Sequence, residues 1–136
     1  MIYEELSAKI LEACFEVSNE LGAGYVESVY EQALIQKQVP AVRQVPLNVT
    51  FRGAIVGEFR ADMIIDGKIL MEIKAVDALV KAHYAQVLNY LKTTGMKVGM
   101  VINFGCARLQ YRRFENRFDS GPDSTGLLQI LFDDKV

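Results

Sequence analysis

The stretch that most constrains this chain covers residues 59–74 and has the pattern of a β-hairpin. Two apolar segments flank Asp66-Gly67, a dipeptide that favours a tight turn between antiparallel strands. Charged residues interrupt both segments: Asp62 in the first, and Glu72 and Lys74 in the second. Charged side chains are costly to bury unless they are paired or bound to a metal. We therefore interpret these three residues as one site.

The length of the turn decides whether the two acids share a face of the hairpin. A two-residue loop at Asp66-Gly67 would place Met71 on the face of Asp62 and send Glu72 to the opposite face. A shared face requires a different register. We therefore predict a three-residue turn with Gly67 in a left-handed conformation, or a bulge nearby.

The rest of the chain alternates between helical and extended patterns. Apolar spacing predicts helices over residues 3–21, over about a dozen residues from 24, and over 80–94. Apolar alternation or continuity predicts strands at 42–51, 55–65, 68–74 and 98–104, and a further edge strand at 109–114. Pro46 indicates an edge position or a bulge in the first strand. The order of strand, helix and buried strand predicts that segments 68–74 and 98–104 are parallel neighbours.

Composition is typical of one globular domain. The chain has 136 residues, of which 51% are hydrophobic and 24% charged, enough for one packed core and too few for two. No apolar run approaches the roughly 20 residues that cross a bilayer, and no secretion signal is evident, so no membrane association is expected. Two distant cysteines and one histidine argue against a structural zinc site and suit a reducing environment. We expect a cytoplasmic protein.

Charge and composition divide the chain unevenly. Residues 1–40 carry two basic and seven acidic side chains, residues 41–118 carry twelve and six, and residues 119–136 carry one and four. The basic middle indicates a polyanionic partner, whereas the net charge of −2 argues against indiscriminate coating of DNA. We therefore expect a domain over 1–118 and a C-terminal tail over 119–136, whose apolar piece at 127–132 docks on the domain or forms a homodimer with a second copy.

Two carboxylates on neighbouring strands suit a hard divalent cation such as Mg²⁺ or Mn²⁺. Asp62 and Glu72 are the expected ligands, with the carbonyl of Ile73 as a third oxygen. The cation would lower the pKa of a water and neutralise charge on a phosphate, and Lys74 would orient that water or stabilise the charge. The simpler alternative is a surface salt bridge between Lys74 and one of the acids. A serine or cysteine nucleophile is disfavoured because His83 has no evident relay partner.

Five short motifs follow one another between about residues 3 and 115. They are Gly24-Tyr-Val-Glu27-Ser-Val-Tyr30, Arg43-Gln-Val-Pro46, Phe59-Arg-Ala-Asp62, Glu72-Ile-Lys74-Ala75 and Ile102-Asn-Phe-Gly105. In order and spacing they resemble the GxxExxY protein family, which is grouped with the PD-(D/E)XK nuclease superfamily. The resemblance implies a restriction-endonuclease-like αβββαβ core, an α/β fold with a mixed sheet flanked by helices, here with an extra N-terminal helix. Ala61 replaces the proline of the superfamily's name.

The resemblance also implies roles for single residues. Asp62 and Glu72 would be metal ligands and Lys74 the catalytic lysine. Glu27 would be a helix-borne acid near the metal. Its position alone instead favours a helix-start glutamate stabilised by the helix dipole. Tyr30 is expected to pack between helix and sheet.

The predicted third helix carries a polar stripe. His83, Gln86 and Tyr90 are spaced to lie along one face of it. Gln86 and Tyr90 match a Gln-x-x-x-Tyr pattern of RecB-like nucleases, which implies that Gln86 contacts a catalytic water or the substrate and Tyr90 a phosphate. Tyr90, Arg60 and His83 are the expected substrate-binding residues.

Three functions of different classes remain open from the sequence. The first is a metal-dependent nuclease that hydrolyses phosphodiester bonds in DNA or RNA. The second is a catalytically silent module that binds nucleic acid or protein on a nuclease scaffold, which the acidic N-terminal helices favour. The third is an assembly protein that dimerises through its tail. The charged hairpin favours the first.

Overall fold

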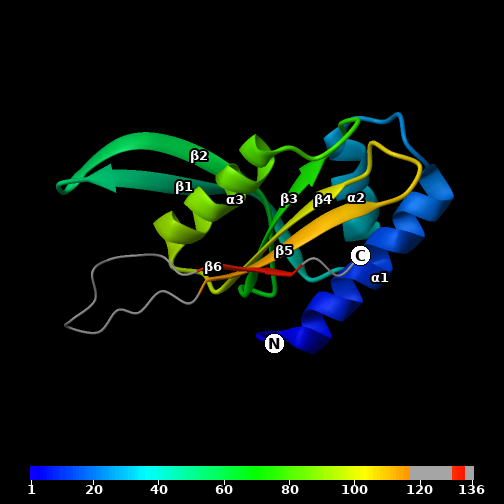
Figure 1. The fold of residues 1–136 in the computed structure, drawn as a ribbon, viewed down its shortest axis with the longest axis horizontal. Coiled ribbons are helices and arrows are strands. Elements are labelled where there is room, and N and C mark those ends of the chain that lie inside the picture. Colours follow the sequence, from blue (N-terminus) through cyan, green and yellow to red (C-terminus); the bar gives the residue numbers. More distant parts are fainter. Residues whose placement is uncertain (117–129, 134–136) are drawn as a thin grey trace.

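The computed structural model describes residues 1–116 and 130–133 (Figure 1). The helices of this part are α1 (Glu4–Leu21), α2 (Glu27–Gln36) and α3 (Lys81–Thr94). The strands are β1 (Ala41–Phe51), β2 (Ala54–Ile65), β3 (Ile69–Lys74), β4 (Val98–Asn103), β5 (Gln110–Asn116) and β6 (Ile130–Asp133). This arrangement confirms the predicted α/β fold, a mixed sheet flanked by helices. None of these helices combines the length and apolar character needed to cross a membrane.

The strands form one sheet in the order β1-β2-β3-β4-β5-β6. Strands β3 and β4 run parallel, as predicted, and every other neighbouring pair is antiparallel. Strand β1 lies at an edge, where Pro46 interrupts no internal ladder.

The prediction that segment 109–114 is an edge strand is wrong. Residues 130–133 of the tail form β6, which pairs with β5 and places β5 inside the sheet. Most of the predicted tail, residues 119–129 and 134–136, lies outside the described residues. The division into a domain and a docking or dimerising tail therefore stays a prediction.

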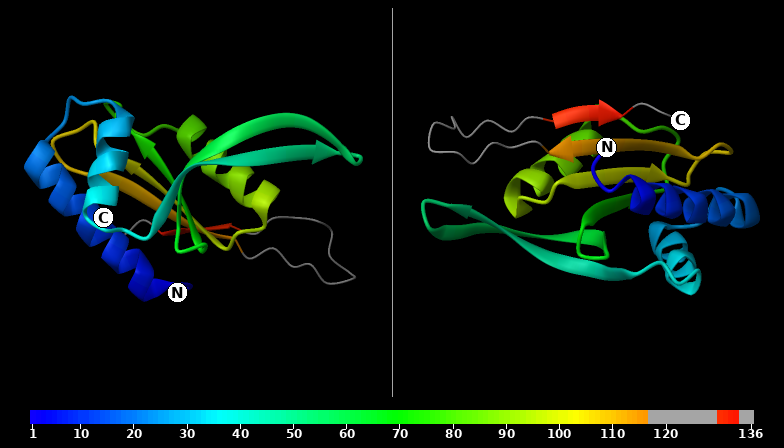
Figure 2. Two further views of the ribbon diagram at one scale, coloured as in Figure 1. Left: turned by 180° about the vertical axis from the view of Figure 1, so that it is seen from behind. Right: turned by 90° about the horizontal axis from the view of Figure 1, so that it is seen from below.

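Helices cover both faces of the sheet (Figures 1 and 2). Helices α1 and α2 pack against one face, where Ile69, Met71 and Ile73 of β3 are buried. Helix α3 packs against the other face, which Leu70 of β3 reaches. Successive residues of a strand point to opposite faces, so Glu72 shares the α3 face with Leu70.

Tyr30 joins α2 to the sheet. Its side chain is buried, and its ring stacks on that of Phe104 with the ring centroids 4.5 Å apart. Its hydroxyl donates to the Gly22 carbonyl at 2.7 Å and accepts from the Tyr25 N–H at 3.2 Å. Tyr30 therefore closes the connection between α1 and α2, which confirms its predicted packing role.

The turn between β2 and β3 has the predicted form. Ile65 pairs with Ile69, which leaves residues 66–68 in the loop. Gly67 has a φ of 65°, the left-handed conformation that glycine adopts at little cost, and the Lys68 N–H donates to the Ile65 carbonyl at 2.9 Å. Continued by one residue beyond the Met63–Met71 pair, this register places Asp62 opposite Glu72, so the two acids lie on one face.

The outer part of the β1–β2 hairpin, residues 45–61, projects beyond the other strands of the sheet (Figure 1). We call this part the arm. Ala61 packs with the residues beneath α3, whereas Met63 packs with those beneath α1 and α2. Residues two apart in a strand normally share a face, so the hairpin twists sharply between them. Gln44, which lies opposite Asp62 in the register, has a φ of 53°. The twist thus occurs at Asp62.

Candidate active site

Asp62 and Glu72 meet where the β2–β3 ladder ends. The last backbone pair of this ladder is Met63 with Met71. One position further, carboxylates replace backbone acceptors: the Asp62 N–H donates to Glu72 Oε1 at 3.3 Å, and the Ile73 N–H donates to Asp62 Oδ2 at 2.8 Å. Each acid is thus held by the backbone of the other's strand.

The environment of Glu72 favours a positive partner. Its side chain is only 2% exposed. The pKa of Glu72 is raised to about 9, mainly by burial and then by a hydrogen bond with the Asp62 side chain and the negative charge of Asp62, whereas the Asp62 backbone N–H and the charge of Lys74 oppose the shift. Two adjacent carboxylates repel each other when both are ionised, so a proton or a cation between them is stabilising. The oxygen donors therefore fit a hard divalent cation.

Lys74 lies beside this pair. It follows Glu72 by two positions on β3, so both side chains leave the same face of the strand. Its positive charge lowers the pKa of Glu72 and, after burial, the pKa of His83. Within residues 1–116, Lys74 forms no ion pair with an acid. The alternative of a simple salt bridge with Asp62 or Glu72 is therefore not the arrangement found.

The backbone that follows Lys74 is fixed by the Asn-Phe-Gly segment that begins at the last residue of β4. The Phe104 N–H donates to the Lys74 carbonyl at 2.8 Å. The Asn103 side chain accepts from the Val76 N–H at 3.0 Å and donates to the Val76 carbonyl at 2.9 Å. A Cβ at Gly105 would overlap the backbone of Val76, so only glycine fits there. These contacts give the motif at 102–105 a structural role behind the lysine.

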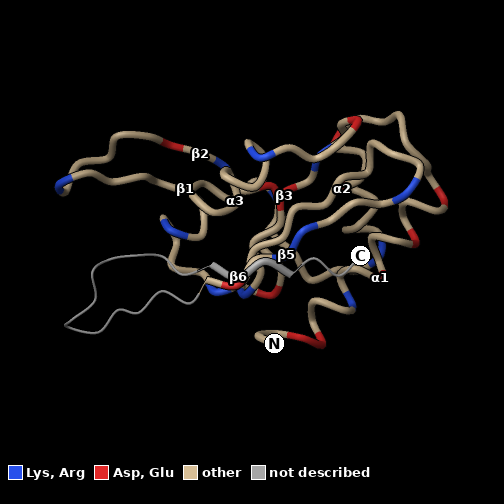
Figure 3. The backbone as a smooth tube through the Cα atoms, viewed as in Figure 1, with Lys and Arg blue, Asp and Glu red and all other residues tan. Residues whose placement is uncertain are grey.

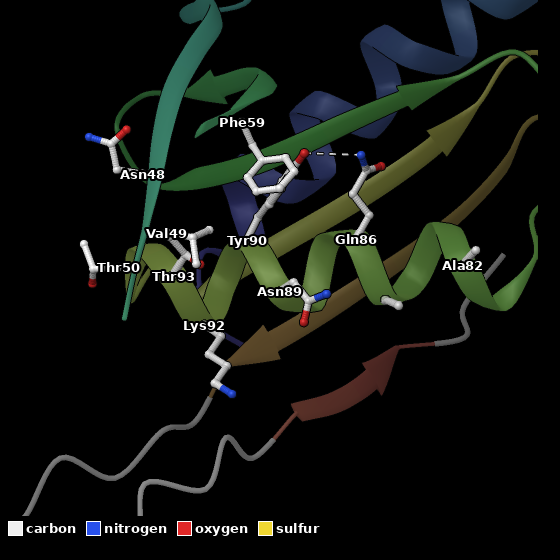
Figure 4. Close-up of a pocket in the computed structure, with 11 residues that line it drawn as sticks. Asn48, Val49, Thr50, Phe59, Ala82, Gln86, Asn89, Tyr90, Lys92 and Thr93 are labelled. Carbon is white, nitrogen blue, oxygen red and sulfur yellow. Dashed lines mark hydrogen bonds between the residues drawn. The ribbon is translucent and has the colours of Figure 1, made fainter. Parts of the chain in front are cut away.

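Helix α3 directs Gln86 and Tyr90 towards the acids. Gln86 Nε2 donates to the Tyr90 hydroxyl at 3.3 Å, as Figure 4 shows. Burial raises the pKa of Tyr90, the hydrogen bond from Gln86 lowers it, and the charges of Glu72 and Asp62 raise it. Tyr90 also packs with Ala61 and Leu70, which adjoin Asp62 and share the face of Glu72 respectively. Gln86 Oε1 is buried without a hydrogen-bond partner among the described residues.

His83 lies on the same stripe but has a structural contact. Its Nδ1 accepts from the Val80 N–H at 3.0 Å and so caps the start of α3. Burial first, and then the charge of Lys74, lower its pKa. His83 is thus kept neutral next to the site, and its predicted contact with substrate stays a prediction.

Two predicted site residues are not joined to the acids by any contact. Arg60 is exposed and alternates with Phe59 and Ala61, which face α3, so it lies on the opposite side of the arm. Glu27 is half-buried at the first position of α2, and within the described part of the chain it makes no hydrogen bond or ion pair with Asp62. Their roles stay predictions.

The described residues contain no group of three or more His, Cys, Asp or Glu side chains placed to hold a metal. Side-chain ligands from these residues are thus limited to Asp62 and Glu72, with the Ile73 carbonyl as the predicted third donor. This is a small ligand set, which leaves positions for water and substrate oxygens.

Sequence reasoning missed Glu31, a buried acid behind the site. Its Oε1 accepts from Arg43 Nε at 3.3 Å and from Gln44 Nε2 at 3.1 Å. Burial raises the pKa of Glu31, and the negative charge of Asp62 adds to this, whereas the contacts with Gln44 and Arg43 lower it. The available signal was the spacing from Glu27, because residues four apart share a helix face. The contacts with Glu31 give Arg43 and Gln44 a structural role. They hold the part of β1 that lies opposite Asp62.

A mixed sheet that brings two acids and a lysine together on neighbouring strands defines a nuclease-type scaffold. The family model of the PD-(D/E)XK nuclease superfamily matches residues 4–114, from α1 to β5. The chain belongs to this superfamily, whose nucleases generally use divalent metals. No curated protein and no solved structure gives a significant match. The finer assignment to the GxxExxY family stays a prediction.

Proposed function

We propose that this protein is a metal-dependent nuclease that hydrolyses phosphodiester bonds in DNA or RNA. The observation that carries the proposal is the contact between Asp62 and Glu72, with Lys74 on the same face of β3 and in no ion pair within the described part of the chain. Membership of a nuclease superfamily supports the same reaction class.

The residues would divide the chemistry as follows. Asp62, Glu72 and the Ile73 carbonyl would hold Mg²⁺ or Mn²⁺, which when bound supplies Lewis-acid stabilisation and a lowered pKa for a water. Lys74 would stabilise the negative charge that develops on the scissile phosphate. Tyr90 keeps its proton because its pKa is raised, so its hydroxyl would donate to a phosphate oxygen. The unpaired Gln86 Oε1 would accept a hydrogen bond from the attacking water.

The remaining expectations belong to the same proposal. Glu27, Arg60 and His83 would act at the margin of the site, on substrate rather than on the cation. A cytoplasmic location, and a homodimer through the tail, also stay predictions.

The test is cleavage of a panel of DNA and RNA substrates with Mg²⁺ and with Mn²⁺. Glu72→Ala and Lys74→Ala should each lower the rate about 10²–10³-fold, the usual effect of removing one electrostatic contributor. Glu58→Ala and Lys68→Ala, which change exposed charges on the same strands and their turn, serve as matched controls and should leave the rate unchanged. Equal activity in all five proteins would identify a contaminating nuclease and contradict the proposal.

The silent binding module is favoured by one observation. With two carboxylate ligands among the described residues and a proton competing for Glu72, the site would bind a cation weakly. That function predicts nucleic-acid binding that is equal with and without divalent cations and no cleavage under any condition. Metal-dependent turnover that Glu72→Ala abolishes would exclude it.

A further inference from the structure

A cleft of about 810 Å³ lies between the arm and α3 (Figure 4). Phe59 forms its wall on the arm side, and Gln86 and Tyr90 line it on the helix side. Tyr90 packs in one cluster with Ala61, which precedes Asp62, and with Leu70, which shares a face of β3 with Glu72. The cleft therefore lies next to the place where cleavage is proposed to occur.

Phe59 offers an aromatic surface to this cleft. Its side chain is 48% exposed, although it is one of the largest apolar residues of the arm. Its ring lies 6.0 Å from that of Tyr90, with 48° between the ring planes. A Cβ at Gly57 would come within 3.1 Å of the Phe59 ring, so the glycine leaves room for the ring at this position. An exposed aromatic ring beside a second ring is a stacking platform.

Most polar groups of the cleft are neutral amides and hydroxyls rather than charges. Asn48, Asn89 and Gln86 line it, and Lys92 is the one charged residue among its lining residues, all of which are described. Over the described residues, basic positions are spread along the trace rather than gathered on one element (Figure 3). Duplex DNA carries one negative charge per roughly 1.7 Å of its axis and is held by many cations. The cleft therefore lacks the chemistry that grips a duplex.

Aromatic rings and amides together match a nucleobase. Bases that are not paired stack on aromatic side chains and form hydrogen bonds through their exposed edges, and this mode dominates the binding of single strands. Gln86 lines the cleft beside Tyr90 (Figure 4), and its buried Oε1 is an acceptor without a partner among the described residues. The cleft volume lies within the roughly 300–1,000 Å³ of small-ligand pockets, which suits one nucleotide.

We propose that this cleft binds an unpaired nucleotide whose base stacks on Phe59, so that the substrate is single-stranded nucleic acid. Lys92 holds a phosphate of the bound strand, and the next phosphate is directed to Asp62 and Glu72. This inference rests on the proposed function and specifies its substrate class.

The test measures binding without turnover, in metal-free protein. Single-stranded oligonucleotides and matched duplexes, of DNA and of RNA, each carry one 2-aminopurine, whose fluorescence is quenched when it stacks. The wild type should bind single strands in preference to duplexes, with quenching. Phe59→Leu keeps the apolar bulk but removes the ring, and should weaken single-strand binding about 5-fold to 100-fold, since stacking of one base contributes about 1–3 kcal/mol. Phe59→Tyr should restore it.

The matched control is Phe51→Leu, which changes a second exposed aromatic residue of the arm's hairpin, at the end of β1, that does not line the cleft. It should leave affinity within twofold, and equal melting temperatures of all variants show that they fold. Equal affinity for duplex and single strand, no effect of Phe59→Leu, or no binding at all would overturn the inference. Single-strand binding through Phe59 without metal-dependent cleavage would support it while contradicting the nuclease function. Comparison of the affinities for the DNA and RNA probes shows whether the cleft prefers deoxyribose or ribose strands.

Discussion

Two buried polar centres of this protein differ in how well their hydrogen bonds are satisfied. Asn103 is fully buried, and its amide contacts the backbone of Val76, the N–H of Gly105 and the Gln110 side chain. At the acid site, by contrast, Asp62 and Glu72 crowd each other, and Gln86 Oε1 is buried without a partner within the described part of the chain.

The difference separates structure from function. A satisfied polar network rigidifies a fold, whereas buried polar groups without full partners are a cost that a ligand can remove. The Asn103 centre holds the backbone that follows Lys74, whereas neither acid of the other centre forms an ion pair among the described residues. Substitution of Asn103 should therefore lower the stability of the fold, and substitution of Asp62 or Glu72 should lower activity.

The largest expected effect is on activity at the acid centre. Glu72→Gln preserves the shape of the side chain but removes a charge, and should lower metal-dependent cleavage about 10²–10³-fold. Its free energy of unfolding at pH 8 should stay equal to that of the wild type or rise, because the buried Glu72 carboxyl must hold a proton that it releases on unfolding, whereas an amide is neutral in both states. Urea unfolding together with cleavage rates measures both. A large loss of stability in this variant would contradict the comparison.

The opposite pattern is expected for the Asn103 centre. Asn103→Ala leaves the N–H and carbonyl groups of Val76 without their partners, which should lower the free energy of unfolding by about 2–4 kcal/mol. Chemical denaturation measures this loss. Asn89→Ala, an exposed amide on α3, is the matched control for stability and should change it by less than about 0.5 kcal/mol. An unchanged stability of Asn103→Ala would show that the amide network is not structural.

The third prediction concerns pH. The pKa of Glu72 is raised to about 9 in the folded state, so its favourable contribution is complete below the unfolded value of 4.5 and is lost as pH rises through 9. Without divalent cations, stability should fall between pH 6 and 8.5 by up to about 1.4 kcal/mol per pH unit from this group. Urea unfolding in a chelating buffer measures the slope. The slope should flatten in Glu72→Gln, and identical slopes in both proteins would contradict the assignment.

The smallest expected effect is at Tyr90. Tyr90→Phe keeps the ring against Phe59 but removes the hydroxyl, which should lower the cleavage rate about tenfold, the effect of one hydrogen bond of about 1.4 kcal/mol. Single-turnover cleavage measures it. Single-strand binding by the same variant should be unchanged within about twofold, since stacking is retained. A loss of binding larger than the loss of rate would move the role of Tyr90 from catalysis to the cleft.

Local patterns in the sequence were enough to predict most of the fold. Apolar spacing located the three helices and strands β1 to β5, and the requirement that Asp62 and Glu72 share a face led to the three-residue turn at 66–68. These features depend on neighbouring residues, whose geometry is restricted by the period of the helix or strand.

Features that depend on distant contacts were not predictable. The twist at Asp62 involves Gln44 of β1, whose side chain is held by Glu31 of helix α2. The inner position of β5 depends on residues 130–133, which follow it only after a long connection. The motif at 102–105 was visible, but its contact with Val76 spans 27 positions of the chain.

The cleft likewise joins segments that no local pattern connects. Its walls come from β1, β2 and α3, which are separated by the hairpin turn and by β3. The sequence identified Gln86 and Tyr90 on one side but gave no reason to select Phe59 on the other.

Calorimetric titration of Mn²⁺ at pH 7.5, in buffers of different ionisation enthalpy, tests the central claim that Asp62 and Glu72 jointly hold a cation. The wild type should bind one ion per chain and release about one proton, because Glu72 is protonated at this pH when no metal is present. Asp62→Asn and Glu72→Gln should bind at least tenfold more weakly. Absence of binding by the wild type, or equal binding by all three proteins, would contradict the claim.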